Sequence, residues 1–560
     1  MRDKPSTGAL PLPATFMNAQ NAVVGLRGRD LLSTLRTLAL QGIKQPVHSA
    51  RHALALGGQL GRVLLGDTLH KVNPQDARFA DPTWQLNPFY RRGLQAYLSW
   101  QKQLGSWIDE SSLPTDDRAR ARFVTTLLGD ALAPSNSPLN PLAVKELLNS
   151  GGASLFKGLG QLLDDLLHND GLPSQVSKQA FEVGRNLAAT PGAVVFRNEL
   201  LELIQYRPMS EKQYLRPLLI VPPQINKYYI FDLSNDKSFV QYALKNGLQC
   251  FIVSWRNPDA RHREWGLSSY VQALEEAMDA CRAITASKDV NLLGACAGGL
   301  TSAALQGHLQ AKRQLRKVAS ATYMVSLLDS QIDSPAMLFA DEQTLEAAKR
   351  RSYQRGVLDG RDMARVFAWM RPNDLIWNYW VNNYLLGNEP PVFDILYWNN
   401  DTTRLPAALH GEFIEMFKTN PLTRSGALEV CGTPIDLKQV TCDFYCVAGT
   451  TDHITPWESC YKSAHLFGGK CEFVLSNSGH IQSILNPPGN PKARYMTNSE
   501  MPLDPKDWQD GSTKHTDSWW LHWQKWLAER SGETKKAPSK LGNRAHPPAE
   551  AAPGTYVHER

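Results

Sequence analysis

At residues 293–299 the chain reads LGACAGG, and this stretch decides the fold that we expect. It follows an apolar run that predicts a strand, and it precedes residues 300–310, which predict a helix. Gly294 and Gly298 flank Cys296, and glycine lets neighbouring backbone approach a tight turn without a Cβ clash. The pattern is that of a nucleophile elbow in which cysteine stands where serine is usual. The positive end of the helix behind Cys296 favours a thiolate.

Short apolar runs alternate with helical patterns on both sides of this elbow. Between residues 268 and 286, apolar side chains recur on one helical face. Runs that predict further strands lie at residues 217–221, 250–255, 319–327, 443–448 and 472–475. Short buried strands that alternate with helices indicate an α/β fold with a largely parallel sheet.

Two polar residues follow late strands in the order that an elbow of this kind requires, which is nucleophile, acid, histidine. Asp452 comes just after residues 443–448, and His480 comes just after residues 472–475. The carboxyl ends of parallel strands are where such sheets place their sites. We therefore predict that Cys296, Asp452 and His480 form a catalytic triad. His453 either assists the acid or proton transfer, or is an ordinary structural residue of the loop.

Composition along the chain predicts three parts. Residues 1–205 contain few β-branched runs and predict a helical N-terminal domain, and residues 206–530 predict the catalytic domain. More than a hundred residues separate the strand ending near Leu328 from the next clear strand, which predicts a cap inserted at about residues 330–430. Residues 531–560 are rich in Lys, Pro, Ala and Gly and predict a flexible tail.

Two segments are candidates for surfaces. Residues 1–70 contain eight Lys or Arg and three Asp, a net charge of +5, and apolar residues at helical spacing. They predict either an interfacial amphipathic surface or helices that pack on the rest of the protein. The expected cap is rich in aromatic residues. These residues would line an acyl tunnel, form a subunit contact, or make up the hydrophobic core of the cap itself.

Charge and hydropathy exclude several classes of protein. The 60 Lys and Arg nearly balance the 54 Asp and Glu, which gives +6 in 560 residues and argues against a nucleic-acid binder. No apolar stretch approaches 18 residues, and the first residues do not read as a secretory signal, so we expect no transmembrane segment and a cytoplasmic location.

The cysteines do not predict a disulfide scaffold. Eight in so long a chain are too few, and we expect most of them to be buried thiols. Cys442, Cys446, His453 and Cys460 could be read as metal ligands. However, Cys442 and Cys446 lie four apart in a strand-like run, and no second close pair completes a site, so we expect no metal.

Six stretches together resemble the polyhydroxyalkanoate synthases, and most closely the single-subunit, medium-chain (class II) type of pseudomonads. They are FADPTWQLNPFYRRGLQAYL (79–98), LLIVPPQINKYYIFDLS (218–234), SWRNPD (254–259), GACAGG (294–299), GTTDHITPW (449–457) and NSGHIQSILNPPG (477–489). The resemblance covers nearly the whole chain. It implies an α/β-hydrolase fold with an inserted cap and a helical N-terminal domain.

The resemblance also implies an activity. The enzyme would be an acyltransferase that polymerises (R)-3-hydroxyacyl-CoA into polyhydroxyalkanoate and releases CoA, with the acyl group carried on Cys296. No cofactor is implied, since CoA is part of the substrate and a product. Expected partners are the growing polymer, the granule surface, phasin-type granule proteins and a second copy of the chain, with Trp398 at the dimer contact.

The expected chemistry assigns further residues. The backbone N–H groups of Ala297 and of a residue near Ile225 would form the oxyanion hole. Ser326 and Gln482 would border the acyl pocket. The alternative is that both are ordinary packing residues. Two other functions stay open: a thioesterase or esterase of the same fold with a cysteine nucleophile, and a catalytically idle granule-coat protein.

Overall fold

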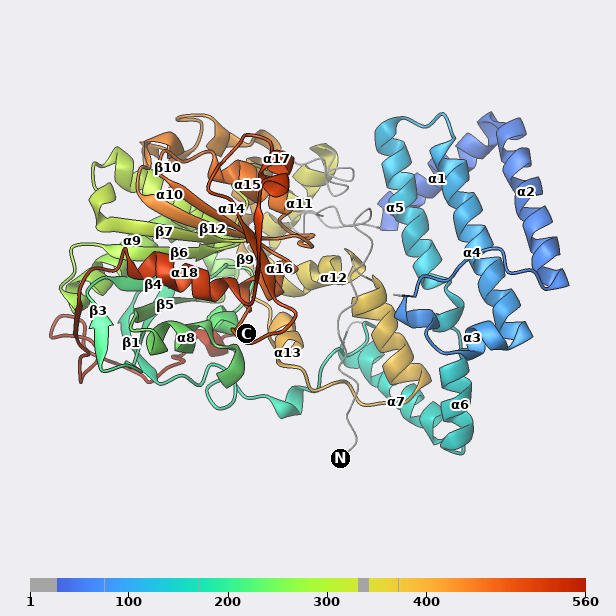
Figure 1. Ribbon diagram of the computed structural model, residues 1–560, viewed down its shortest axis with the longest axis horizontal. Coiled ribbons are helices and arrows are strands. Elements are labelled where there is room, and N and C mark those ends of the chain that lie inside the picture. Colours follow the sequence, from blue (N-terminus) through green and yellow to red (C-terminus); the bar gives the residue numbers. More distant parts are fainter. Residues whose placement is uncertain (1–27, 75, 170, 331–341, 371) are drawn as a thin grey trace. The chain divides into compact units, whose positions relative to one another are not determined.

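The computed structural model describes residues 28–560 except 75, 170, 331–341 and 371 (Figure 1). Contacts within the chain define two compact units. The first comprises residues up to 177 together with 365–392, and the second comprises residues 178–333, 342–364 and 393–560, apart from those excluded.

The first unit is helical, as its composition predicts. α4 begins at Pro88, and the Asn87 side chain accepts hydrogen bonds from the first turn as an N-cap. The helices are α1 (Gly28–Lys44), α2 (Pro46–Leu65), α3 (Thr83–Leu86), α4 (Pro88–Asp109), α5 (Thr115–Ala131), α6 (Pro141–Asn149) and α7 (Ala153–His168), with π-helical turns η10 (Asn373–Trp377) and η11 (Trp380–Leu385).

The second unit is built on a sheet of ten strands in the order β1-β2-β5-β4-β6-β7-β12-β13-β14-β15. The six strands from β5 to β13 run parallel, and the outer strands add antiparallel. The strands are β1 (Gly192–Arg197), β2 (Leu201–Tyr206), β4 (Pro217–Val221), β5 (Gln249–Trp255), β6 (Val290–Ala295), β7 (Val318–Met324), β12 (Asp443–Gly449), β13 (Cys471–Ser476), β14 (Arg494–Thr497) and β15 (Thr513–Thr516).

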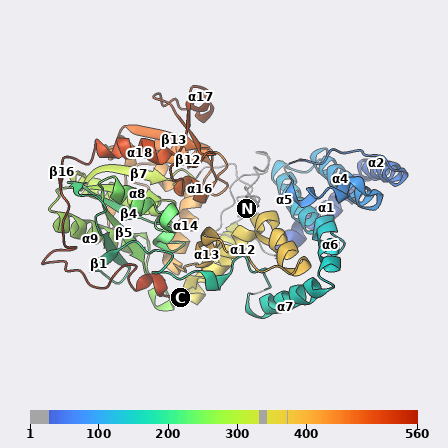
Figure 2. The ribbon, with the colours of Figure 1, turned by 60° about the horizontal axis from the view of Figure 1, so that its bottom comes forward.

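Helices cover both faces of this sheet (Figures 1 and 2). The chain moves from β4 to β5 in one direction and from β5 to β6 in the other, so right-handed crossovers put α8 and α9 on opposite faces. The helices are α8 (Phe239–Lys245), α9 (Leu267–Thr285), α10 (Ala297–Ala311), α15 (Trp457–Ala464), α16 (His480–Ile484), α17 (Pro505–Asp510) and α18 (Trp519–Ala528). The reversal makes the carboxyl ends of β4 and β6 a topological switch point.

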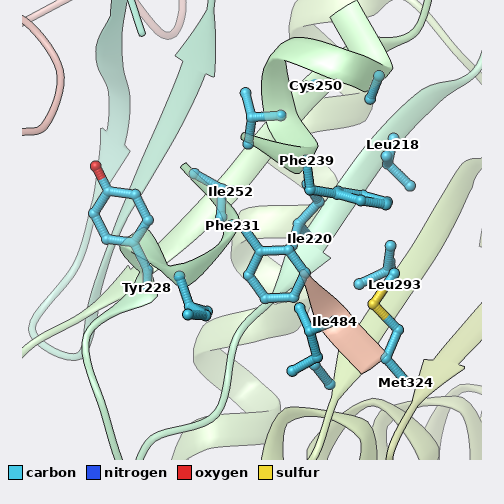
Figure 3. Close-up of a cluster of buried hydrophobic side chains, with 14 of the residues drawn as sticks. Leu218, Ile220, Tyr228, Phe231, Phe239, Cys250, Ile252, Leu293, Met324 and Ile484 are labelled. Carbon is cyan, nitrogen blue, oxygen red and sulfur yellow. The ribbon is translucent and has the colours of Figure 1, made fainter. Parts of the chain in front are cut away.

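The strands at the centre are mostly apolar, which is typical of a parallel sheet buried on both faces. Every residue of β4, β5 and β6 is buried. On one face, Phe239 of α8 packs against Trp523 of α18 with ring centroids 4.8 Å apart. Figure 3 shows Phe239 beside Leu218, Ile220 and Leu293, which come from β4 and β6.

The structure divides the predicted cap between the two units. Residues 365–392 group with the first unit, while 342–364 and the residues from 393 to the start of β12 group with the second. The second-unit part contains α11 (Glu342–Arg355), β8 (Val357–Leu358), α13 (Asp394–Asn400), β9 (Leu405–Pro406), α14 (Ala407–Thr419), β10 (Glu429–Val430) and β11 (Thr433–Pro434), while α12 (Gly360–Met370) spans the division.

Two other boundaries differ from the sequence prediction. β1 and all of β2 but its last residue lie before residue 206, yet both strands belong to the sheet, because their apolar residues are buried there as an antiparallel pair. Residues 531–560 are not a separate tail. Within them β16 (Thr534–Lys536) pairs with β3 (Lys212–Tyr214), and Tyr556 and Val557 are buried. Polar contacts hold this segment, which composition does not reveal: the buried carboxylate of Glu202 accepts hydrogen bonds from Thr555 and from the Tyr556 N–H.

No helix among the described residues is long and apolar enough to cross a membrane.

Candidate active site

Cys296 occupies the turn between β6 and α10. Its φ of +50° lies in the left-handed region, which costs energy for any residue with a side chain. A Cβ at Gly294 would lie 2.7 Å from the Gly299 Cα, and one at Gly298 would collide with the Val221 carbonyl oxygen. The glycines around Cys296 are therefore required by close backbone approach, as the sequence predicts for an elbow.

Asp452 and His480 meet beyond the ends of β12 and β13. His480 Nδ1 lies 2.7 Å from Asp452 Oδ2. The other oxygen, Oδ1, accepts hydrogen bonds from the N–H groups of Ile454 at 2.8 Å and Thr455 at 2.9 Å. The Thr455 hydroxyl donates to Oδ2 at 2.8 Å. The carboxylate thus has one fixed orientation and can hold the imidazole in one orientation.

Asp452 and His480 each stabilise the charged form of the other. Burial by itself raises the pKa of Asp452, but the facing His480 and the hydrogen bonds from Thr455 lower it below its usual value. Burial likewise lowers the pKa of His480, but Asp452 and the Cys296 sulfur, which hydrogen-bonds to the ring, raise it well above its usual value. The site therefore stabilises a protonated His480 facing the Asp452 carboxylate, and it brings all three predicted triad residues together.

The predicted oxyanion donors lie at the switch point. Ala297 is the first residue of α10, so its N–H has no acceptor within the helix. The loop after β4 packs on the same helix, because Gly298 abuts the Val221 and Pro222 carbonyls and Gln224 Nε2 donates to Thr301 Oγ1 at 2.8 Å. Ile225 is the next residue of this loop.

The two predicted pocket residues are placed differently. Ser326 is buried, donates to the Met324 carbonyl at 3.0 Å and abuts Gly299 of the elbow. It also lines a small cavity with Leu328, Cys446 and Cys460. Gln482 is exposed on α16, and the structure does not bring it together with Ser326.

Trp398 differs from the surface role that the resemblance implies. Its side chain is 4% exposed, and its Nε1 donates to the Lys227 carbonyl at 2.7 Å. A side chain buried within one chain offers little area to a partner, so Trp398 acts inside the fold. His453, beside the acid, is half-buried.

Sequence reasoning missed two residues of this site. Thr455 orients Asp452, and its signal is a hydroxyl residue three positions after the acid in a tight loop. Thr301 anchors Gln224, and sequence carries no signal for it because the two are 77 positions apart.

One group among the described residues has metal-ligand spacing: His48, His52 and Glu110 in the first unit. Arg51 donates to the Glu110 carboxylate, and its guanidinium lies within 3.4 Å of both imidazoles. The positively charged guanidinium therefore takes the position that a metal ion would need. Of the cysteines considered as ligands, Cys446 and Cys460 are buried and Cys442 is half-buried, and none of them is in a disulfide.

Comparison with known proteins identifies the family. Residues 217–487 match the model of the alpha/beta hydrolase fold, and residues 75–243 match that of the poly-beta-hydroxybutyrate polymerase (PhaC) N-terminus. The chain is 69% identical over 560 residues to poly(3-hydroxyalkanoate) polymerase 2 of Ectopseudomonas oleovorans, covering 100% of both chains. It is 63% identical over 540 residues to polymerase 1 of the same organism, covering 96% of each. It is 37% identical over 551 residues to the polymerase subunit PhaC of Cupriavidus necator, covering 96% of this chain and 92% of that one.

The fold and the elbow define an α/β-hydrolase-fold protein, and the expected fold class is confirmed. The chain belongs to the poly(3-hydroxyalkanoate) polymerase family, which confirms the resemblance seen in its sequence.

Proposed function

We propose that this protein is an acyltransferase that polymerises (R)-3-hydroxyacyl-CoA, of medium chain length, into polyhydroxyalkanoate. The observation that carries the proposal is Cys296 on a strained elbow beside His480, whose ring Asp452 orients. The names of the relatives agree with it.

The first step loads the enzyme. The Cys296 sulfur attacks the thioester carbonyl of the acyl-CoA, and His480 takes the thiol proton. When the carbon–sulfur bond to CoA breaks, the leaving thiolate receives that proton. One thioester replaces another, so the acyl group stays activated, whereas serine would convert it to a less reactive ester. The cycle needs no cofactor, because CoA enters with the substrate.

The second step lengthens the chain. His480 removes the proton from the 3-hydroxyl of one acyl unit, and the alkoxide attacks the thioester of another. An ester bond forms, the thioester bond breaks, and the departing sulfur takes the proton. The Ala297 and Ile225 N–H groups stabilise the oxyanion in both steps, and a donor of this kind is typically worth about 3 kcal/mol.

The apolar product has a matching surface on the first unit. Six large apolar residues of α7 are exposed along one face: Leu155, Phe156, Leu159, Leu163, Leu166 and Leu167. An amphipathic helix of this kind lies on an apolar–water boundary. We assign it to the granule surface and place the enzyme there, with phasin-type granule proteins and a second copy of the chain as further partners.

One assay separates polymerisation from the alternative function, thioester hydrolysis by the same cysteine. CoA release and light scattering are followed together during turnover of a 3-hydroxyacyl-CoA series, and the products are then analysed. Polymerisation gives turbidity with little free acid. Stoichiometric 3-hydroxy acid without turbidity would identify a thioesterase.

A further inference from the structure

Residues 222–227 form the loop that follows β4, and they are fastened to three different parts of the second unit. The first is α10, through the contact of Gly298 with the Val221 and Pro222 carbonyls and the bond from Gln224 to Thr301. These contacts set one edge of the loop against the helix that begins beside Cys296.

The second fastening comes from residues 398–403, which lie 171 or more positions away in the sequence. The Thr403 hydroxyl donates to the Gln224 carbonyl at 2.7 Å, and its N–H donates to the Ile225 carbonyl at 3.4 Å. Trp398 Nε1 donates to the Lys227 carbonyl at 2.7 Å. Three of the loop's carbonyl groups are therefore held by this segment.

The third fastening is the side chain of Lys227. It is 3% exposed, and its Nζ donates to the Glu559 carbonyl at 2.6 Å. Glu559 is held in turn, because its carboxylate accepts from Arg256 Nε at 3.2 Å and from the Asn257 N–H at 3.1 Å. A buried ammonium is costly unless its partners are fixed, so this contact ties the loop to residues 555–560 in one geometry.

We propose that Lys227 is a positioning residue for the oxyanion hole: by binding the Glu559 carbonyl it holds the loop 222–227 so that the Ile225 N–H stays directed at the acyl group on Cys296. The inference rests on the proposed function and gives the contact of Glu559 with the loop a part in catalysis. Lys227 touches no reacting atom. It acts through Ile225, two positions before it.

A small displacement of this loop has a large effect. A shift of about 1 Å at a reacting group can cost about 100-fold in rate, and complete removal of one oxyanion donor costs about 100- to 1,000-fold. A loosened loop should therefore slow acylation by at least about 10-fold, with little change in KM, because substrate binding does not depend on the donor's exact angle.

The experiment reads the oxyanion hole directly on the full chain. Octanoyl-CoA labelled with ¹³C at its carbonyl has no 3-hydroxyl and so loads Cys296 without chain growth. An oxyanion hole polarises the thioester carbonyl and lowers its infrared stretching frequency. In Lys227→Met this band should move to higher wavenumber, and single-turnover CoA release should slow by at least about 10-fold. Lys227→Arg, which keeps charge and donor, should restore part of both.

A second variant and a matched control keep the test sharp. Thr403→Val removes the hydroxyl bond to Gln224 at nearly constant volume and should shift the band in the same direction, even where Lys227→Met folds poorly. Lys237→Met removes a partly buried lysine of the same unit, whose Nζ lies 2.7 Å from Asp394 Oδ1, and should leave the band in place. If the band is unshifted in both Lys227→Met and Thr403→Val while Cys296 is loaded, the positioning role of Lys227 is wrong and the proposed function still stands. Failure of the unaltered protein to load Cys296 would overturn the proposed function as well.

Discussion

His480 Nδ1 lies 2.7 Å from Asp452 Oδ2, and the same oxygen accepts the Thr455 hydroxyl at 2.8 Å. The acid is fully buried and is held by three donors from its own loop as well as by the imidazole. This arrangement fixes which ring nitrogen faces the acid and leaves the other for Cys296, so both steps of the reaction depend on it.

Replacing the acid should separate the two steps of the reaction. Asp452→Asn should cripple steady-state turnover more than the first acylation, because a thiol gives up its proton far more easily than the alcohol that must be activated in chain growth. Single-turnover CoA release is compared with steady-state release. Equal losses in both would contradict the division of labour between sulfur and hydroxyl.

The orienting hydroxyl should matter by itself. Thr455→Val removes a donor to a charged acceptor, a bond worth about 1.5–3 kcal/mol, so turnover should fall by about 10-fold or more. Thr455→Ser keeps the hydroxyl and should retain most of the activity. If Val and Ser behave alike, Thr455 serves only to pack the loop.

Stability should depend on pH through His480. Its pKa is raised in the folded protein, so its stabilising contribution is complete below the usual value of 6.5 and is lost as the pH rises through the folded value. The pKa of Asp452 is lowered, so its contribution is lost only in acid. The free energy of unfolding, measured by urea denaturation from about pH 6 to 10, should fall in the unaltered protein relative to His480→Gln. A constant difference between the two would show that the imidazolium is not stabilised.

The apolar face of α7 should affect association and not bond making. Leu159→Glu with Leu163→Glu places two charges on that face, where both side chains are about half exposed. Binding to polymer granules in a sedimentation assay should fall, while CoA release in solution stays unchanged. Lys157→Glu changes the charge of the exposed neighbour at Lys157 and is the control. Unaltered sedimentation of the double variant would remove α7 from the granule contact.

Much of the catalytic unit could be predicted from sequence because its signals are local. The elbow glycines, the apolar strands and the loops carrying Asp452 and His480 each occupy a few consecutive residues, and strand order then brings them to one edge of the sheet. The roles of Trp398 and Lys227 depend on partners 171 and 332 positions away, which no local pattern records. Residues 531–560 misled the prediction for the same reason, since their composition is that of a tail and their contacts are distant.

The central claim is that the acyl group is carried on Cys296, and mass analysis of the loaded enzyme tests it most directly. The protein is mixed with octanoyl-CoA, quenched in acid and digested, and the peptide that bears the acyl mass is sequenced. We expect the adduct on Cys296, no adduct and no polymer with Cys296→Ala, and at most a trace of activity with Cys296→Ser. Loading should be normal with Cys250→Ala, which alters a buried thiol away from the elbow. An adduct on any other residue, or polymer made by Cys296→Ala, would contradict the account.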